Sequence, residues 1–225
     1  MIDLAIILCG GKGTRFGADK PLTCYRGRTI ISHVLEAVSD AKIERVILQA
    51  NIENHEEIQK EAEKYLDTYL VDSHPPNGVR RIPLKFESEI RKGFYLIAGN
   101  QPLRSDHLEK LKTEYLRDKE WALTLYPWEI SDALEDDRPV SISDEGYLYV
   151  TTEKRFIAHL PAIIDARILC HIERENFQYR IIRTFYNALN FQKIHGVIAN
   201  MPPEFDDEKM FKKTRGYIDA LYTYH

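Results

Sequence analysis

Three cations and three glycines gather in one short stretch near the start of the chain. They are Gly10, Gly11, Lys12, Gly13, Arg15 and Lys20. Glycines let a backbone turn tightly and approach a ligand without side-chain clash. Backbone amides in such a turn, together with fixed positive charges, are the groups that a polyphosphate requires. We therefore interpret residues 8–21 as a loop that suits a polyphosphate ligand.

Two well-known phosphate loops are excluded by spacing. A Walker A loop needs Gly-Lys followed by Ser or Thr, whereas Gly13 follows Lys12 here. The dinucleotide fingerprint needs its third glycine three residues after its second, and Gly17 comes one residue too late. The next strand of that fold should also end in an acid that holds a ribose, but the apolar run 45–50 is followed by Asn51.

Alternating strand and helix patterns predict the elements that position this loop. Apolar runs at 4–8, 45–50, 68–71 and 93–98 indicate buried strands. A helix is expected to start near Thr29 or Ser32, and another over 53–66, which gives an α/β fold with a parallel sheet. Ligands bind beyond the carboxyl ends of such strands. The residues that follow the expected strands are the loop 10–15, Asn51, Asp72, Asn100 and Asn200.

The pattern shifts towards β-structure after Trp121. We expect a strand at 122–126 and a hairpin formed by 140–143 and 147–151. The remaining expected elements are a strand at 156–160, helices at 161–171 and 175–189, a strand at 195–199 and a helix at 206–223. The aromatic residues between 177 and 191 are interpreted as core or as the face of a homodimer.

The glycine-rich stretch resembles the phosphate loop of nucleotidyltransferases, which transfer a nucleoside monophosphate from an NTP to a phosphorylated acceptor. Their pattern is Leu-x-Gly-Gly-x-Gly-Thr-Arg followed by Lys-Pro, and residues 8–15 and 19–21 match it. The spacing between Phe16 and Pro21 is most similar to the MobA-like branch, the molybdenum-cofactor guanylyltransferases. The alternative for the stretch is a surface turn with solvated Lys and Arg side chains.

The resemblance implies a three-layer α/β/α sandwich around a mainly parallel, Rossmann-like sheet of the nucleotide-diphospho-sugar transferase (GT-A-like) type. We expect one domain over 1–225, with an NTP-binding half at 1–110 and an acceptor-binding half with a C-terminal helix at 111–225. GTP is the first expected nucleotide and CTP the second. The expected acceptor is molybdopterin, a sugar 1-phosphate or another alcohol phosphate.

The resemblance also implies roles for single residues. Arg15 would neutralise the β- and γ-phosphates, and Lys20 the α-phosphate or the acceptor phosphate. Mg²⁺ is the implied cofactor, bridging phosphate oxygens. The implied nucleotide-binding residues are Leu8, Cys9, Gly10, Gly11, Lys12, Gly13, Thr14, Asn51, Asp72 and Gly78, and the implied metal ligands are Asn100 and Asn200.

One departure from the family pattern concerns the metal. The family usually has Gly-Asp-x-Pro where this chain has Gly-Asn-Gln-Pro at 99–102. Three explanations stay open: Asp72 or Asp106 supplies the charge, the NTP itself holds the metal, or the chain is a non-catalytic nucleotide-binding relative with a regulatory or scaffold role. A nucleotide-sugar glycosyltransferase is a further alternative, but no expected strand end carries the acidic pair that such enzymes use.

Bulk properties exclude other classes. The net charge of −4 argues against a nucleic-acid binder that relies on a broad basic face. The three cysteines form no CxxC pair, which argues against a disulfide framework or a zinc site and favours a reducing compartment. The apolar run at 4–8 is too short for a signal peptide or a membrane span, so we expect a cytoplasmic protein without a membrane partner.

Overall fold

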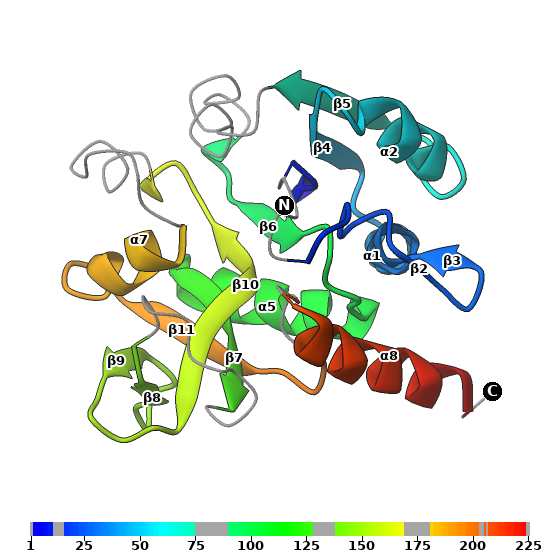
Figure 1. The fold of residues 1–225 in the computed structure, drawn as a ribbon. Coiled ribbons are helices and arrows are strands. Elements are labelled where there is room, and N and C mark those ends of the chain that lie inside the picture. The colour runs from blue at the N-terminus through cyan, green and yellow to red at the C-terminus, as the bar shows by residue number, and fades with distance from the viewer. Residues whose placement is uncertain are drawn as a thin grey trace. The chain divides into compact units, whose positions relative to one another are not determined.

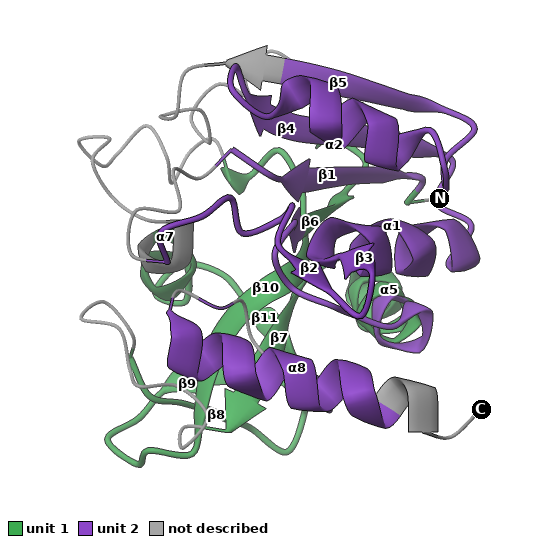
Figure 2. Ribbon diagram, turned by 45° about the vertical axis from the view of Figure 1, so that its right-hand side comes forward, with its two compact units in different colours: residues 1–2, 79–96, 109–199 green, residues 3–78, 97–108, 200–225 purple. Residues whose placement is uncertain are grey.

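The computed structural model describes residues 2–10, 16–74, 90–127, 138–168, 181–202, 205 and 207–223. The chain forms two compact units, each assembled from separate segments (Figure 2). The first, here called the loop unit, comprises residues 3–78, 97–108 and 200–225. The second, here called the hairpin unit, comprises residues 1–2, 79–96 and 109–199. The division into halves at residue 110 stays a prediction.

The loop unit contains a parallel sheet whose strands are connected by helices (Figure 1). Strands β1 (Leu4–Leu8), β4 (Arg45–Asn51) and β5 (Tyr69–His74) pair in parallel, in that order. Helix α1 (Ile30–Asp40) precedes β4, and helix α2 (His55–Ala62) lies between β4 and β5 in the chain. The strand–helix alternation predicted from the sequence is confirmed, and it places the carboxyl ends of the three strands at one edge.

A small hairpin links the glycine-rich stretch to α1. It consists of β2 (Cys24–Tyr25) and β3 (Arg28–Thr29), joined by Arg26 and Gly27 with φ of 51° and 76°. Thr29 then caps α1, because its side chain accepts a hydrogen bond from the amide of Ser32. The sequence predicts a helix that starts near Thr29 or Ser32, and the structure shows that Thr29 is the capping residue.

Helix α8 (Glu208–Thr223) packs in the loop unit through an aromatic cluster. The ring of Phe16, just after the glycine-rich stretch, lies 5.0 Å from that of Phe205 and 5.3 Å from that of Phe211. The Tyr25 hydroxyl donates to the carboxylate of Asp219 at 2.8 and 2.9 Å. The segment 16–25 is therefore held by residues from 205 onwards.

The hairpin unit contains a mixed sheet. Its strands pair in the order β11 (Ile194–Ile198), β7 (Trp121–Pro127), β10 (Phe156–Ile164) and β6 (Phe94–Ala98). The last two residues of β6 belong to the loop unit. β11 is parallel to β7, whereas β10 is antiparallel to both neighbours. β10 is thus the reversed strand in an otherwise parallel set, and the predicted α/β class with a mainly parallel sheet is confirmed.

The predicted hairpin is also confirmed, as β8 (Val140–Ile142) and β9 (Leu148–Val150). Two helices complete the described chain: α5 (Ser105–Asp118), which runs from the loop unit into the hairpin unit, and α7 (Ile181–Ala188). Within the described residues, no helix combines the length and the apolar character that crossing a bilayer requires.

The helix predicted to begin at residue 161 is wrong, because β10 continues to Ile164. Ala162 and Ile163 pair with β7 on one side and β6 on the other, so both sides of the backbone are used in the sheet. The register with β7 shifts between His159 and Ala162, and Pro161, which has no amide donor, lies inside that irregularity. An apolar run buried on both faces does not reveal its period.

Candidate functional site

The first nucleotide-binding residues expected from the sequence lie at the carboxyl end of β1. Cys9 is fully buried, and its amide donates to the carbonyl of Gln49 in β4 at 2.7 Å. Burial raises the pKa of the Cys9 thiol, and the nearby Asp19 carboxylate adds to the effect. Leu8 and Gly10 flank Cys9 and are half-buried. The predicted residues Gly11, Lys12, Gly13, Thr14, Arg15 and Gly78 lie outside the described residues.

Asn51 ends β4 and starts the turn into α2. Its Oδ1 accepts hydrogen bonds from the amides of Glu53 at 2.8 Å and Asn54 at 2.9 Å. The side chain is 6% exposed. Because the oxygen is engaged by the backbone, the group that Asn51 can offer a ligand is its Nδ2 donor, which suits a ribose hydroxyl or a base carbonyl.

Asn54 connects three segments of this site and was not predicted from the sequence. Its Oδ1 accepts from the amide of Asn51 at 2.9 Å, and its Nδ2 donates to the carbonyl of Cys9 at 3.0 Å. The same Nδ2 lies 2.6 Å from the Oδ2 of Asp19. Asn54 therefore brings together the ends of β1 and β4 and the Asp-Lys-Pro turn, three of the segments that the resemblance assigns to the nucleotide.

The turn that carries Lys20 is closed by hydrogen bonds on both sides. Asp19 accepts from the amide of Leu22 through Oδ1 and from the Thr23 hydroxyl through its backbone carbonyl. The carbonyl of Pro21 accepts from the amide of Ile31 in α1 at 2.9 Å. Burial raises the pKa of the Asp19 carboxyl, and the hydrogen bond from Asn54 opposes that rise. Half-buried Lys20 is thus carried by a turn fixed to α1 and α2.

Asp72 lies inside β5, not after it, so the strand end predicted at residue 71 is wrong. The strand continues to His74 because residues 72–74 still pair with residues 49–51 of β4. Asp72 stands opposite Gln49, and both side chains are buried, at 8% and 2% exposed. A contact between Asp72 and the nucleotide stays a prediction.

The two predicted metal ligands differ in their surroundings. Asn100 follows β6, is 5% exposed, and donates through Nδ2 to the carbonyl of Phe205 at 3.0 Å. Its neighbour Gln101 donates to the carbonyl of Pro202 at 3.0 Å. Asn200 lies two residues beyond β11 and is exposed. An amide can donate to these carbonyls and a carboxylate cannot, so the structure gives a reason for the departure from Gly-Asp-x-Pro.

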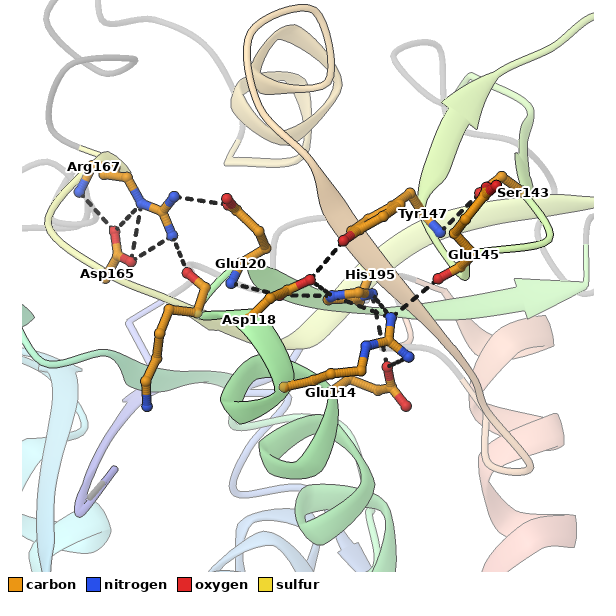
Figure 3. Close-up of polar contacts among 11 residues, drawn as sticks. Glu114, Asp118, Glu120, Ser143, Glu145, Tyr147, Asp165, Arg167 and His195 are labelled. Atoms are coloured by element: carbon orange, nitrogen blue, oxygen red, sulfur yellow. Dashed lines mark hydrogen bonds and ion pairs between the residues drawn. The ribbon is translucent and has the colours of Figure 1, made fainter.

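A polar cluster in the hairpin unit, here called the Asp118 network, was not predicted from the sequence (Figure 3). The Nε2 of fully buried His195 lies 2.9 and 3.0 Å from the carboxylate oxygens of Asp118, and the Tyr147 hydroxyl donates to that carboxylate at 2.6 Å. Arg117 contacts His195 Nδ1. Burial opposes ionisation of Asp118, but the hydrogen bonds from Tyr147 and His195 outweigh it and lower the pKa to about 2.

The position of the Asp118 network indicates a structural role. His195 is the second residue of β11 and pairs with Ala122, the second residue of β7. The network therefore lies at the amino ends of these strands, whereas ligands of parallel sheets bind at the carboxyl ends. Three elements meet there: the end of α5, the β8–β9 hairpin and β11.

A second ion-pair cluster lies at the end of β10 and the start of β7, and Figure 3 shows it beside the Asp118 network. Arg167 contacts the carboxylate of Asp165 through Nε and Nη2 and that of Glu120 through Nη1 at 2.8 Å. The Trp121 indole donates to Asp165 at 3.2 Å. Burial opposes ionisation of Asp165, but these donors lower its pKa overall. Both carboxylate oxygens of Asp165 are thus used in contacts within the fold.

Known proteins that are similar in sequence match part of the chain. A probable molybdenum cofactor guanylyltransferase of Bacillus cereus is 30% identical over 70 residues, which is 31% of this chain and 32% of that protein. One from Thermococcus gammatolerans is 30% identical over 102 residues, 44% of this chain and 49% of that protein. These alignments span between a third and a half of the relatives' length.

Solved structures match over almost the whole chain and show the fold. The inositol-1-phosphate CTP transferase from T. maritima has a TM-score of 0.76 at 13% identity and covers 97% of this chain and 96% of its own. The UTP-bound UGPase from Acinetobacter baumannii has a TM-score of 0.68 at 15% identity and covers 100% of this chain and 93% of its own.

A family model spans most of the chain as well. It is the MobA-like NTP transferase domain, and it matches residues 5–189, which include the glycine-rich stretch, Asn54, β4 and all but the first residue of β1. The geometry at the ends of β1 and β4 and this match point the same way: the chain belongs to the family of MobA-like NTP transferase domains.

Proposed function

We propose that this protein is an enzyme that transfers a nucleoside monophosphate from an NTP to a phosphorylated acceptor and releases pyrophosphate. GTP is the favoured nucleotide and CTP the second, and the acceptor is molybdopterin or a sugar 1-phosphate. The observation that carries the proposal is the convergence of Cys9, Asp19 and Asn51 on one buried amide, that of Asn54. The choice of GTP rests on the named guanylyltransferase relatives, and CTP on the T. maritima structure.

The proposed reaction is a displacement at phosphorus. An oxygen of the acceptor phosphate attacks the α-phosphorus of the NTP, the bond from that phosphorus to the bridging oxygen breaks, and pyrophosphate leaves with the electron pair. The acceptor is already an anion, so the enzyme needs no strong base. Positioning and charge neutralisation then supply the catalysis. Lys20 would neutralise the α-phosphate or the acceptor phosphate, and Arg15 the β- and γ-phosphates.

In this proposal the triphosphate itself holds most of the magnesium ion's coordination, with few ligands from the described residues. Among them, no group of three or more His, Cys, Asp or Glu side chains is arranged to bind a metal. Magnesium commonly keeps several waters and binds through substrate phosphates and few protein ligands. Asn100 and Asn200 would add neutral oxygens, and Asn100 would do so through Oδ1, because its Nδ2 donates to Phe205. When bound, the ion supplies positive charge to the phosphates.

The proposal is tested by measuring pyrophosphate release from each of the four NTPs with Mg²⁺ against a panel of phosphorylated acceptors. Lys20→Ala is the test variant, and Lys60→Ala, which removes an exposed lysine from α2, is the matched control. We expect acceptor-dependent release from GTP that Lys20→Ala abolishes and Lys60→Ala preserves.

Other results identify the alternative. Tight nucleotide binding by calorimetry without turnover on any acceptor would favour a non-catalytic nucleotide-binding role. Asn100, which replaces the usual aspartate of the family pattern, is the reason for considering that role. Absence of binding for all four NTPs would contradict the assignment of the glycine-rich stretch to phosphates.

A further inference from the structure

Asn54 stands at the N-cap of α2 but does not cap that helix. Asparagine at an N-cap usually accepts a hydrogen bond from an amide in the first turn. The Asn54 side chain makes no such bond, and the turn is instead closed by the Oδ1 of Asn51. The buried Asn54 side chain contacts three other groups instead of the amides of its own helix, and these contacts indicate its role.

Two of those three contacts reach segments that are distant in sequence. The Nδ2 of Asn54 bridges the carbonyl of Cys9 and the carboxylate of Asp19, which lie on either side of the glycine-rich residues 10–18. The Oδ1 fixes the amide of Asn51 at the end of β4. The two ends of the proposed phosphate loop are therefore tied to one side chain at the start of α2.

The chemistry of Asp19 agrees with this arrangement. Its Oδ1 accepts from the amide of Leu22 at 3.3 Å while its Oδ2 accepts from Asn54 at 2.6 Å. An asparagine at position 19 has one acceptor oxygen and could satisfy only one of the two donors. A carboxylate beside bound phosphates would repel them, so contacts that hold both of its oxygens towards α2 and Leu22 reduce that conflict.

We propose that Asn54 is a positioning residue of the nucleotide site, one that fixes both ends of the phosphate loop and the turn carrying Lys20 before the nucleotide binds. This inference rests on the proposed function. Asn54 touches neither the nucleotide nor the acceptor in this scheme and acts through Cys9, Asp19 and the residue after it. A loop whose two ends are fixed in advance loses less conformational entropy when the triphosphate binds, which raises affinity.

The test uses calorimetric binding of GTP with Mg²⁺ to the full chain, together with thermal unfolding. Asn54→Asp places two carboxylates at the 2.6 Å contact, and we expect GTP binding to weaken by at least about tenfold. Asp19→Asn is the milder variant, with an expected loss of about fivefold. Gln59→Ala removes an exposed amide from the same helix and is the matched control, with unchanged affinity expected.

Exchange of the two groups separates positioning from a general loss of structure. In the double variant Asn54→Asp with Asp19→Asn, an amide again faces a carboxylate, so affinity should recover in part. Recovery should be incomplete because the carbonyl of Cys9 loses its donor. The losses of GTP affinity caused by Asn54→Ala and Lys20→Ala should also be non-additive, since Asn54→Ala disturbs the turn that carries Lys20.

The outcomes distinguish this inference from the proposed function. Partial recovery in the exchanged variant, with non-additivity towards Lys20→Ala, would support the positioning role. Two results would overturn the inference and leave the proposed function standing. One is GTP affinity unchanged by Asn54→Asp. The other is a loss of affinity in proportion to the fall in unfolding temperature, and additive with the loss caused by Lys20→Ala. If the unaltered chain binds no NTP, the proposed function is wrong and this inference falls with it.

Discussion

Gly99 lies so close to Cys9 that a methyl group added at position 99 would stand 2.7 Å from the Cys9 Sγ. The same methyl group would lie 3.0 Å from the carbonyl oxygen of Leu8, which already accepts a hydrogen bond from the Gly99 amide at 2.9 Å. The backbone after β6 is therefore in direct contact with the end of β1. Glycine is required here for close approach, because real Cβ atoms do not come within 3.0 Å of other heavy atoms.

We expect Gly99→Ala to lower the unfolding temperature and to weaken NTP binding. The added methyl group pushes Cys9 and Leu8 away from β6, at a cost of about 1–3 kcal/mol for an overpacked core. Thermal unfolding and calorimetry with GTP measure the two effects. Adding Cys9→Ala removes the sulfur and should restore part of the stability, since the contact with the Leu8 carbonyl remains. A Gly99→Ala protein as stable as the wild type would contradict the contact.

Asn100→Asp is expected to destabilise the protein without improving its use of magnesium. The change removes the donor to the Phe205 carbonyl and turns a carboxylate oxygen towards that carbonyl in a buried place. A buried acceptor left unpaired costs about 1–3 kcal/mol.

Thermal unfolding and the magnesium dependence of turnover test this expectation. Asn200→Asp is the matched control, because Asn200 is exposed and its change adds the same charge without removing the bond to Phe205. Its unfolding temperature should stay that of the wild type. Unchanged stability of Asn100→Asp together with faster turnover at low magnesium would show that position 100 is a metal site first.

The Asp118 network is expected to make the protein sensitive to acid below pH 4. The pKa of Asp118 is about 2 in the folded chain, against 3.8 for the free group. The carboxylate therefore contributes stability that is fully present above about pH 4 and is lost as the pH falls through 2.

Asp118→Asn removes this contribution, and its deficit against the wild type should shrink as the pH falls from 5 to 2. Unfolding temperatures of both proteins across that range measure it. Glu153→Gln, on an exposed ion pair with Arg155, is the control and should follow the wild-type curve. Parallel curves for Asp118→Asn and the wild type would show that the network does not lower the Asp118 pKa.

The two cysteines that the structure describes should differ in reactivity. Burial raises the pKa of Cys9 and removes it from solvent, whereas Cys24 in β2 is exposed. Because the thiolate is the nucleophile, brief treatment of the native protein with iodoacetamide should label Cys24 and spare Cys9. Peptide mass spectrometry measures both, and labelling in denaturant is the control. Rapid native labelling of Cys9 would mean that the end of β1 opens readily.

The parts of this molecule that follow from local sequence were predicted well. The apolar run 4–8 predicts a strand, and β1 confirms it, because a short buried strand depends on neighbouring residues alone. The phosphate loop that the glycine spacing predicts stays a prediction. The end of β5 and the continuation of β10 through Pro161 were missed. In both cases pairing with a neighbouring strand decides where the element stops, and the local residues do not reveal that pairing.

Long-range contacts set the limit for the candidate site. The side-chain amide of Asn100 donates to a carbonyl 105 residues later in the chain. That of Asn54 donates to a carbonyl 45 residues earlier and to a carboxylate 35 residues earlier. Reading position 100 as a weakened metal ligand was reasonable from the family pattern alone. Its hydrogen bond to Phe205 becomes visible only when the two segments are seen side by side.

The packing of Phe16 against Phe205 and Phe211 affects how the protein is made. A ribosome adds roughly 5–20 residues per second, so Phe16 waits on the order of 10–40 s for residues about 190 positions later. During that interval the nascent chain lacks the Phe205 and Phe211 rings against which Phe16 packs. The packing around Phe16 is therefore completed late in synthesis, and slow translation of the middle segment would lengthen the time for which this ring stays exposed.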